Sequence, residues 1–162
     1  MSSPLLLMEK VTLTFECKNL PRQDILSKSD PMLVLYRIEN GKKQLIGRTD
    51  PIMNNEDPKS DKRFELDFFF EQIQLLFVEI YDIDTNHYDN LQEHDFLGCA
   101  QFSLASVMSS TGSMLSMQLK DKKNELVFKS SFSKKDQDRA LIIINGDKVQ
   151  SNRNKIKFQI KC

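Results

Sequence analysis

Residues 75–98 have the sequence "LLFVEIYDIDTNHYDNLQEHDFLG". Its first eight residues are mostly apolar and predict a buried β-strand over 75–82, and "LGCAQFSL" predicts the next strand over 97–104. The polar segment between them is therefore a loop that begins where a strand ends. This loop gathers acidic residues with no Lys or Arg among them, at Asp82, Asp84, Asp89, Glu93 and Asp95.

Strand patterns like this one recur along most of the chain. Alternation of apolar and polar residues, or short apolar runs between turn signals such as "ENGKK" and "NGDK", favours strands over helices. Only "LASVMSST" predicts a helical turn or two. The predicted strands cover 9–17, 31–38, 43–49, 63–69, 75–82, 97–104, 114–119, 125–130, 139–145 and 155–161. We therefore predict an all-β fold, an antiparallel β-sandwich.

The composition bounds the class of protein. A chain of 162 residues with 40% hydrophobic residues suits one globular domain with a good core. Its 23 basic residues balance its 23 acidic ones, which argues against a nucleic-acid-binding protein held by a positive field. The apolar run in the N-terminal segment "MSSPLLLMEK" is too short for a secretory signal peptide. Three widely spaced cysteines without a C-x-x-C motif indicate reduced thiols. We expect a cytoplasmic monomer.

The chain divides into a main domain over 5–147 and a tail over 148–162. The segment "GDKVQSNRNK", 146–155, is polar and resembles a linker. After it, "NKIKFQIKC" alternates apolar and basic residues, a pattern typical of a half-buried strand. Two interpretations stay open, because this strand could close the sandwich or begin a second module.

Aspartates at two places in the chain predict a metal site. Asp82 and Asp84 are two residues apart at a strand end, so both carboxylates can face one point. "DILSKSDP" places Asp24 and Asp30 in another loop. If the two loops share one end of the sandwich, these carboxylates converge with Asp95, and each pair about 4 Å apart repels by about 4 kcal/mol at an effective dielectric of 20. Oxygen ligands on flexible loops favour Ca²⁺ over Mg²⁺, although many loops rich in Asp hold no ion.

Four segments together resemble a known family. They are "LSKSDPMLVLY", "IGRTDPIMNNEDPKSDKRFELDFFFE", "LFVEIYDID" and "HDFLG", in this order. Over about residues 9–145 they resemble the first C2 domain of the copines. The resemblance implies an eight-stranded sandwich with calcium-binding loops at one end. It also implies calcium-dependent binding of a cytoplasmic protein to membranes that contain acidic phospholipids.

The resemblance implies which residues of this sequence would bind calcium. The family's ligand aspartates fall on Asp24, Asp30, Asp82, Asp84 and Asp95, with the backbone carbonyl of Ile83 as a further ligand. We keep Asp89 as an additional candidate ligand, and we expect two or more Ca²⁺ ions. Copines continue into a second C2 domain and a von Willebrand A-like domain. The tail over 148–162 is then either the last strand of this domain or the start of a truncated second C2 domain.

Bound Ca²⁺ would nearly cancel the charge of the aspartates and could bridge to lipid head groups. Candidate membrane contacts are Ile25, Leu26 and Lys28 in the first loop, and Tyr88 and Leu91 in the third. Lys59, Lys62 and Arg63 near the second loop are further basic candidates. The competing interpretation is that the apolar residues tuck into the sandwich and that the basic ones are ordinary solvated surface.

Two other functions compete with calcium-triggered membrane targeting. The only histidines, His87 and His94, could form a Zn²⁺ or Fe²⁺ centre with Asp82 and Asp84, but their spacing matches no zinc motif, so we predict no enzymatic activity. The alternative function is a protein-interaction or adaptor domain that does not need calcium. We predict a membrane-targeting module that binds anionic phospholipids of the phosphatidylserine type, with protein partners as an addition.

Overall fold

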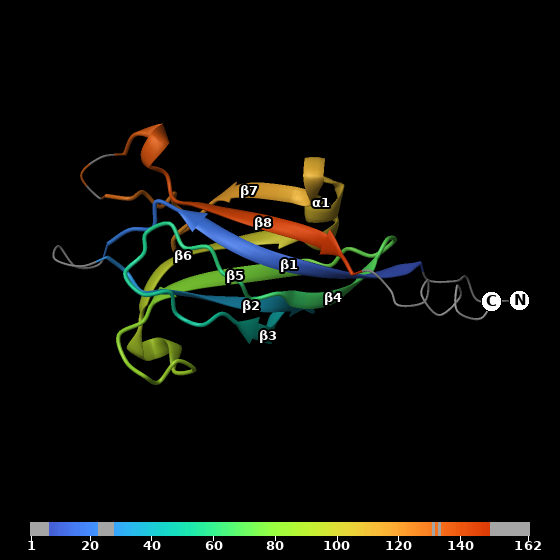
Figure 1. Cartoon of the computed structure of the whole chain (residues 1–162), viewed down its shortest axis with the longest axis horizontal. Coiled ribbons are helices and arrows are strands. Elements are labelled where there is room, and N and C mark those ends of the chain that lie inside the picture. Colours follow the sequence, from blue (N-terminus) through green and yellow to red (C-terminus); the bar gives the residue numbers. More distant parts are fainter. Residues whose placement is uncertain (1–6, 23–27, 131, 133, 150–162) are drawn as a thin grey trace, which may run out of the picture.

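Two antiparallel four-stranded sheets form a sandwich in the computed structural model, which describes residues 7–22, 28–130, 132 and 134–149 (Figure 1). The first sheet has the order β4-β1-β8-β7, with β4 (Phe64–Phe69), β1 (Met8–Lys18), β8 (Leu141–Lys148) and β7 (Met114–Gln118). The second has the order β3-β2-β5-β6, with β3 (Lys42–Arg48), β2 (Pro31–Glu39), β5 (Leu75–Asp82) and β6 (Asp95–Ser103). The predicted all-β, eight-stranded sandwich is thereby confirmed.

Short helical segments lie in the connections between strands. The α-helix α1 (Leu104–Ser109) follows β6, where the sequence predicts a turn or two of helix. Its first turn is capped because the hydroxyl of Ser103 accepts a hydrogen bond from the backbone N–H of Ser106. The single 3₁₀ turns are η1 (Leu91–Glu93), η2 (Thr111–Ser113) and η3 (Asp136–Asp138).

The strand predictions fail in the segment before β8. Residues 125–130 form no strand. Leu126 and Phe128 form isolated bridges, with Lys120 and Arg139 respectively, and Ser130 is a further isolated bridge residue. The apolar pattern there reflects inward packing of Val127 against the core rather than a ladder of paired residues. β8 also begins and ends later than the predicted 139–145, because its last residues pair with β1. The predicted strand 155–161 lies outside the described residues, so the division at 148 stays a prediction.

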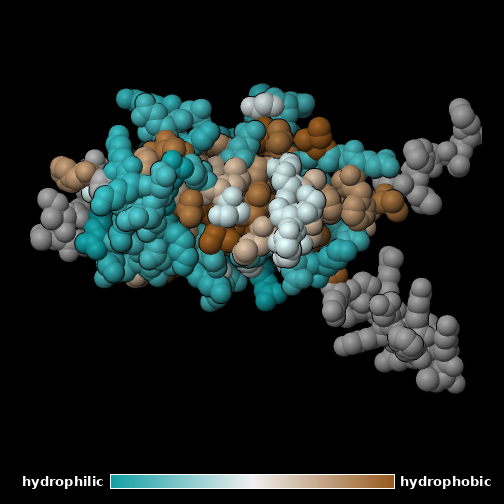
Figure 2. All heavy atoms as spheres, turned by 90° about the horizontal axis from the view of Figure 1, so that it is seen from above, coloured by the Kyte–Doolittle hydropathy of each residue, from teal (hydrophilic) through white to brown (hydrophobic). Residues whose placement is uncertain are grey.

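The core sits between the two sheets and follows the period-two pattern of the strands. Leu13 and Phe15 of β1 point inward, as do Ile142 and Ile144 of β8, while the residues between them face away from the core. A second apolar cluster covers the outer face of the other sheet, around Met32, Val34, Tyr81 and Ile83. Figure 2 shows polar side chains over one end of the sandwich and apolar ones over the middle of the viewed face.

Four connections meet at one end of the sandwich, which we call the loop end. β1, β3, β5 and β7 all finish there, and β2, β4, β6 and β8 begin there, because neighbouring strands run antiparallel (Figure 1). The loop end therefore holds the β1–β2, β3–β4, β5–β6 and β7–β8 connections. The sequence prediction that the two acidic loops share one end is confirmed by this topology.

A matched pair of leucines tests the assignment of the core. Leu35 in β2 is fully buried, whereas Leu45 on the edge strand β3 is 66% exposed. We expect Leu35→Ala to lower the free energy of unfolding by about 2–5 kcal/mol, because it leaves a cavity between the sheets. Leu45→Ala should change it by less than about 0.5 kcal/mol. Urea unfolding followed by circular dichroism measures both, and equal losses would contradict this core.

Candidate metal centre

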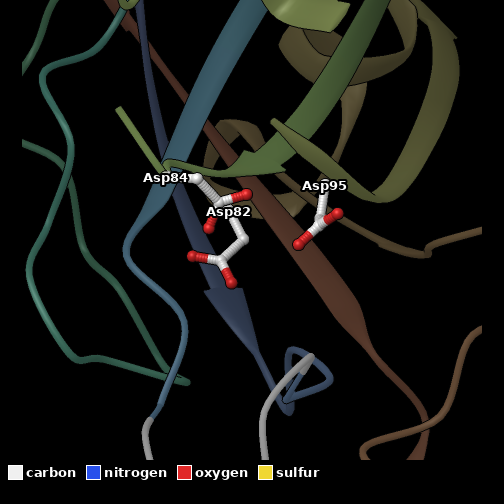
Figure 3. A group of neighbouring side chains, drawn as sticks. All are labelled: Asp82, Asp84 and Asp95. Carbon is white, nitrogen blue, oxygen red and sulfur yellow. The ribbon is translucent and has the colours of Figure 1, made fainter. Parts of the chain in front are cut away.

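Strand register brings three carboxylates together at the loop end. Asp82, the last residue of β5, pairs with Pro31 at the start of β2 and with Asp95 at the start of β6. Asp84 follows two residues later, so its side chain returns to the side of Asp82. Carboxylate oxygens of Asp82, Asp84 and Asp95 all lie within 4.8 Å of one another, and Figure 3 shows the three side chains turned toward a shared space.

Backbone hydrogen bonds tie this cluster to the two loops beside it. The N–H of Asp30 donates to Oδ1 of Asp82 at 2.9 Å, and the N–H of Ile83 donates to the carbonyl of Asp30 at 3.1 Å. The carboxylate of Asp30 in turn accepts from the N–H of Asn54 at 2.5 Å. The β1–β2, β3–β4 and β5–β6 connections are therefore joined through one aspartate. Asp82 is half-buried, while Asp84 and Asp95 are exposed.

His94 fixes the turn that carries Asp84. Its Nδ1 accepts the backbone N–H of Asp84 at 3.1 Å, so its Nε2 carries the proton and donates to the carbonyl of His87 at 2.9 Å. His94 is buried, and both ring nitrogens are engaged. His87 faces Glu93 instead, with its Nδ1 at 3.0 Å from the carboxylate. These contacts argue against a Zn²⁺ or Fe²⁺ centre, because His94 has no nitrogen left for a metal.

The cluster is destabilised electrostatically by its own charge. Burial raises the pKa of Asp82 above its ordinary value, and the charges of its acidic neighbours add to this, although the N–H of Asp30 opposes it. Burial also raises the pKa of Asp84, together with the charge of Asp95 and a hydrogen bond to that carboxyl. No Lys or Arg in the described ranges forms an ion pair with these three aspartates. A cation from solution would relieve this repulsion.

The geometry fits Ca²⁺. Calcium binds oxygen ligands at about 2.3–2.6 Å, so two oxygens on one ion are at most about 5 Å apart. The spacing of up to 4.8 Å among the three carboxylates lies within this limit. A loop end that supplies only oxygens suits calcium, which accepts six to eight ligands in irregular geometry. The residues present therefore fit one ion held by Asp82, Asp84 and Asp95.

The other predicted ligands lie differently. Asp30 adjoins the cluster through its backbone, but one of its carboxylate oxygens accepts the N–H of Asn54. Ile83 lies between two of the aspartates, and its side chain is buried in the second apolar cluster. Asp89 is 3.0 Å from Nε of Arg48, an ion pair outside the cluster. Asp24 lies outside the described residues. The roles of these four residues stay predictions.

The predicted membrane contacts are only partly described. Ile25 and Leu26 lie outside the described residues. Lys28 is exposed, and its backbone N–H donates to the side chain of Asn54 at 3.1 Å. Tyr88 and Leu91 are half-buried against the second apolar cluster, and the guanidinium of Arg48 lies 5.3 Å from the centre of the Tyr88 ring. That packing gives Tyr88 and Leu91 a structural role, and membrane contact by either stays a prediction.

A buried acid that the sequence does not predict as a functional residue links three loops by ion pairs. Glu56 in the β3–β4 connection is only 6% exposed and forms ion pairs with Arg22, before β2, and with Lys129, before β8, the latter at 3.5 Å. Burial alone would raise its pKa, but the hydrogen bonds and charges of these two cations outweigh it and hold the pKa of Glu56 below its ordinary value. Nothing local in "NNEDPKSDK" signals this, because both partners are distant in sequence.

Comparison with known proteins places this architecture in a class. The C2 domain family matches residues 10–123, and the chain belongs to that family, as a C2 domain of the copine type. C2 domains are regulatory binding domains that bind phospholipid membranes and in some cases proteins. No helix in the described part of the chain is both long and apolar enough to cross a membrane.

Two similar relatives are copines of Dictyostelium discoideum. Copine-A of Dictyostelium discoideum is 37% identical over 111 residues, which cover 68% of this chain and 18% of the relative. Copine-D of the same organism is 32% identical over 114 residues, 68% of this chain and 22% of the relative. The chain thus spans about a fifth of the length of these relatives. The solved pair of C2 domains from Extended-Synaptotagmin 2 shares the fold, with a TM-score of 0.56, 19% identity, and coverage of 95% of this chain and 52% of that one.

Replacing the buried acid tests its role in the loop end. Glu56→Gln keeps the shape of the side chain but removes its charge, and we expect a loss of about 1–2 kcal/mol in the free energy of unfolding at pH 7, since solvent screens its half-exposed partners. Because the folded pKa of Glu56 is lowered, its contribution is present above the unfolded pKa of about 4.3 and is lost as the pH falls through the folded value. Urea unfolding at pH 7 and below pH 4 measures the difference.

Glu65→Gln is the matched control for this charge. Glu65 is 56% exposed and lies 3.9 Å from an equally exposed lysine, Lys10. Its replacement should change the free energy of unfolding by less than about 0.5 kcal/mol at either pH. Equal losses in the two variants would contradict a special role of the buried acid.

Neutralising one member of the acidic cluster should stabilise the calcium-free protein. Removing the charge of Asp84 relieves a repulsion of about 1 kcal/mol per pair even at the dielectric of water. We expect Asp84→Asn in EGTA to raise Tm by about 3 °C. The pKa values of Asp82 and Asp84 are raised in the folded state, so the electrostatic destabilisation of the wild-type protein disappears as the pH falls through those values. The difference in Tm between Asp84→Asn and wild type should therefore shrink on acidification. A Tm unchanged or lowered at pH 7 would contradict like-charge strain.

Proposed function

We propose that this chain is a calcium-triggered module that binds membranes containing anionic phospholipids of the phosphatidylserine type. The observation that carries the proposal is the cluster of three carboxylates within 4.8 Å of one another, which has no basic partner among the described residues. Such a cluster at the loop end is a site for a hard cation with oxygen ligands. Membership of the C2 domain family supports membrane binding as the function of this site.

Charge reversal at the loop end is the proposed switch. Without calcium, three carboxylates in one place repel an anionic lipid surface. One Ca²⁺ adds two positive charges, and a second ion, held with Asp30 and Asp24, would bring the loop end close to neutrality. Three carboxylates leave part of the coordination shell of Ca²⁺ for other oxygens. Lipid phosphate or serine carboxylate oxygens would complete it, so that the ion bridges protein and lipid.

Basic residues at the loop end would add to the attraction once calcium is bound. Lys28 precedes the site, and Lys59, Lys62 and Arg63 follow in the β3–β4 connection, all of them exposed. Each basic residue near an anionic surface contributes about 1 kcal/mol at most, and salt screens it. We propose that the protein is recruited from the cytoplasm to the membrane surface and released when calcium falls.

Sedimentation with vesicles tests the proposal directly. The chain is mixed with vesicles of phosphatidylcholine with or without phosphatidylserine, in EGTA, Ca²⁺ or Zn²⁺. We expect pelleting with phosphatidylserine vesicles in Ca²⁺ and at least about tenfold weaker binding in EGTA, since unshielded aspartates face the lipid. Asp82→Asn with Asp84→Asn should abolish the calcium-dependent part, because two of the three carboxylates lose their charge.

The control removes the same charge from the opposite end of the sandwich. Asp67→Asn with Asp147→Asn should pellet like wild type, because those residues lie in β4 and β8 away from the loop end. Equal pelleting of wild type in EGTA and Ca²⁺ would refute the switch and favour a protein-interaction domain that needs no calcium. Unchanged calcium-dependent binding in the first double variant would refute the site.

A further inference from the structure

One large apolar side chain at the loop end has no part in the site described above. Phe132, in the β7–β8 connection, is 98% exposed, the highest value among the large apolar residues of the described ranges. Lys134 and Lys135 follow it, both exposed, and neither forms an ion pair within the described part of the chain. We call these three residues the Phe132 patch.

Contacts on both sides of the patch fix its connection to the loop end. On the N-terminal side, the ammonium of Lys129 lies 3.5 Å from the buried carboxylate of Glu56. On the C-terminal side, the side-chain amide of Asn19 donates to the carbonyls of Gln137 and Arg139, each at 3.1 Å. The Phe132 patch therefore projects from a connection that is fastened before and after it to the neighbouring loops.

The same neighbouring loops contact the acidic cluster. The β3–β4 connection contacts the β7–β8 connection through Glu56, and the N–H of its Asn54 donates to the carboxylate of Asp30 in the β1–β2 connection. The N–H of Asp30 in turn donates to the carboxylate of Asp82 in the cluster. In Figure 1 the β7–β8 connection, drawn in orange, extends from the same end of the sandwich as the connection after β5. A surface that meets the metal site can thus also meet the Phe132 patch.

We propose that the Phe132 patch is a second membrane-contacting element, outside the three loops around the metal site. It inserts the ring of Phe132 below the head groups and sets Lys134 and Lys135 against lipid phosphates. Burying an exposed aromatic ring in an apolar layer is favourable, and flanking lysines are attracted to an anionic surface. The proposal rests on the proposed function, because calcium brings the loop end to the membrane.

The size and chemistry of the patch favour a lipid surface over a folded protein partner. A specific protein interface buries about 800 Å² on each side and centres on a well-packed apolar core. A single exposed ring with two exposed lysines is much smaller than that. One aromatic ring beside cationic groups is, however, sufficient for the boundary between head groups and acyl chains, where aromatic side chains lie at other membrane interfaces.

A single tryptophan reports directly on insertion, because the chain contains no Trp. Phe132→Trp is mixed with phosphatidylserine vesicles in Ca²⁺, and its fluorescence is recorded with and without brominated lipids. We expect emission to shift to shorter wavelength and to be quenched by bromine near the head groups, only when calcium is present. Ile73→Trp is the control, since Ile73 is 86% exposed in the β4–β5 connection at the opposite end, and its emission should not change.

Affinity measurements separate this proposal from the function on which it rests. Phe132→Ala should bind the same vesicles at least about fivefold more weakly in Ca²⁺, while calorimetry without lipid should give unchanged calcium binding. Ile73→Ala should bind vesicles like wild type. Calcium-dependent pelleting with a tryptophan emission that neither shifts nor is quenched would overturn the Phe132 proposal and leave the proposed function standing. If wild type does not pellet in Ca²⁺, both proposals fall together.

Discussion

The antiparallel register of β5 between β2 and β6 determines both which side chains enter the core and where the aspartates lie. It sets Asp82 opposite Pro31 on one side and Asp95 on the other. The same register buries Val78 and Ile80 in the core, so a slip of one residue would expose those side chains and turn the aspartates away from one another. Packing of the core thus fixes the metal site, although the site itself contributes no apolar contact.

Repulsion among carboxylates destabilises the loop end, and polar contacts between the connections hold it together. Three carboxylates within 4.8 Å of one another repel, and burial adds to the cost for Asp82. Glu56 with its two cations and the hydrogen bonds of Asp30 offset this by linking the connections to one another. Sites that bind ligands are commonly built in regions of low local stability, and here the bound cation would supply the missing stabilisation.

The sequence predicts features that depend on local spacing and misses those that depend on loop conformation. Period-two patterns predict the sandwich, and the spacing of two residues predicts the meeting of Asp82 and Asp84. The ion pairs of Glu56, however, reach back 34 residues to Arg22 and forward still further to Lys129, so no local pattern reports them. The predicted strand at 125–130 fails for a related reason, because Val127 packs against the core while its neighbours form isolated bridges rather than a continuous ladder.

Calcium binding by the aspartates at the end of β5 and the start of β6 is the proposal on which the membrane switch rests. A titration with CaCl₂ in the absence of lipid, followed residue by residue through amide chemical shifts in NMR spectra, tests it most directly. We expect saturable shifts that are largest at Asp30, at residues 82–84 and at Asp95, and that EGTA reverses. Absent shifts, or shifts largest at the opposite end of the sandwich, would contradict it.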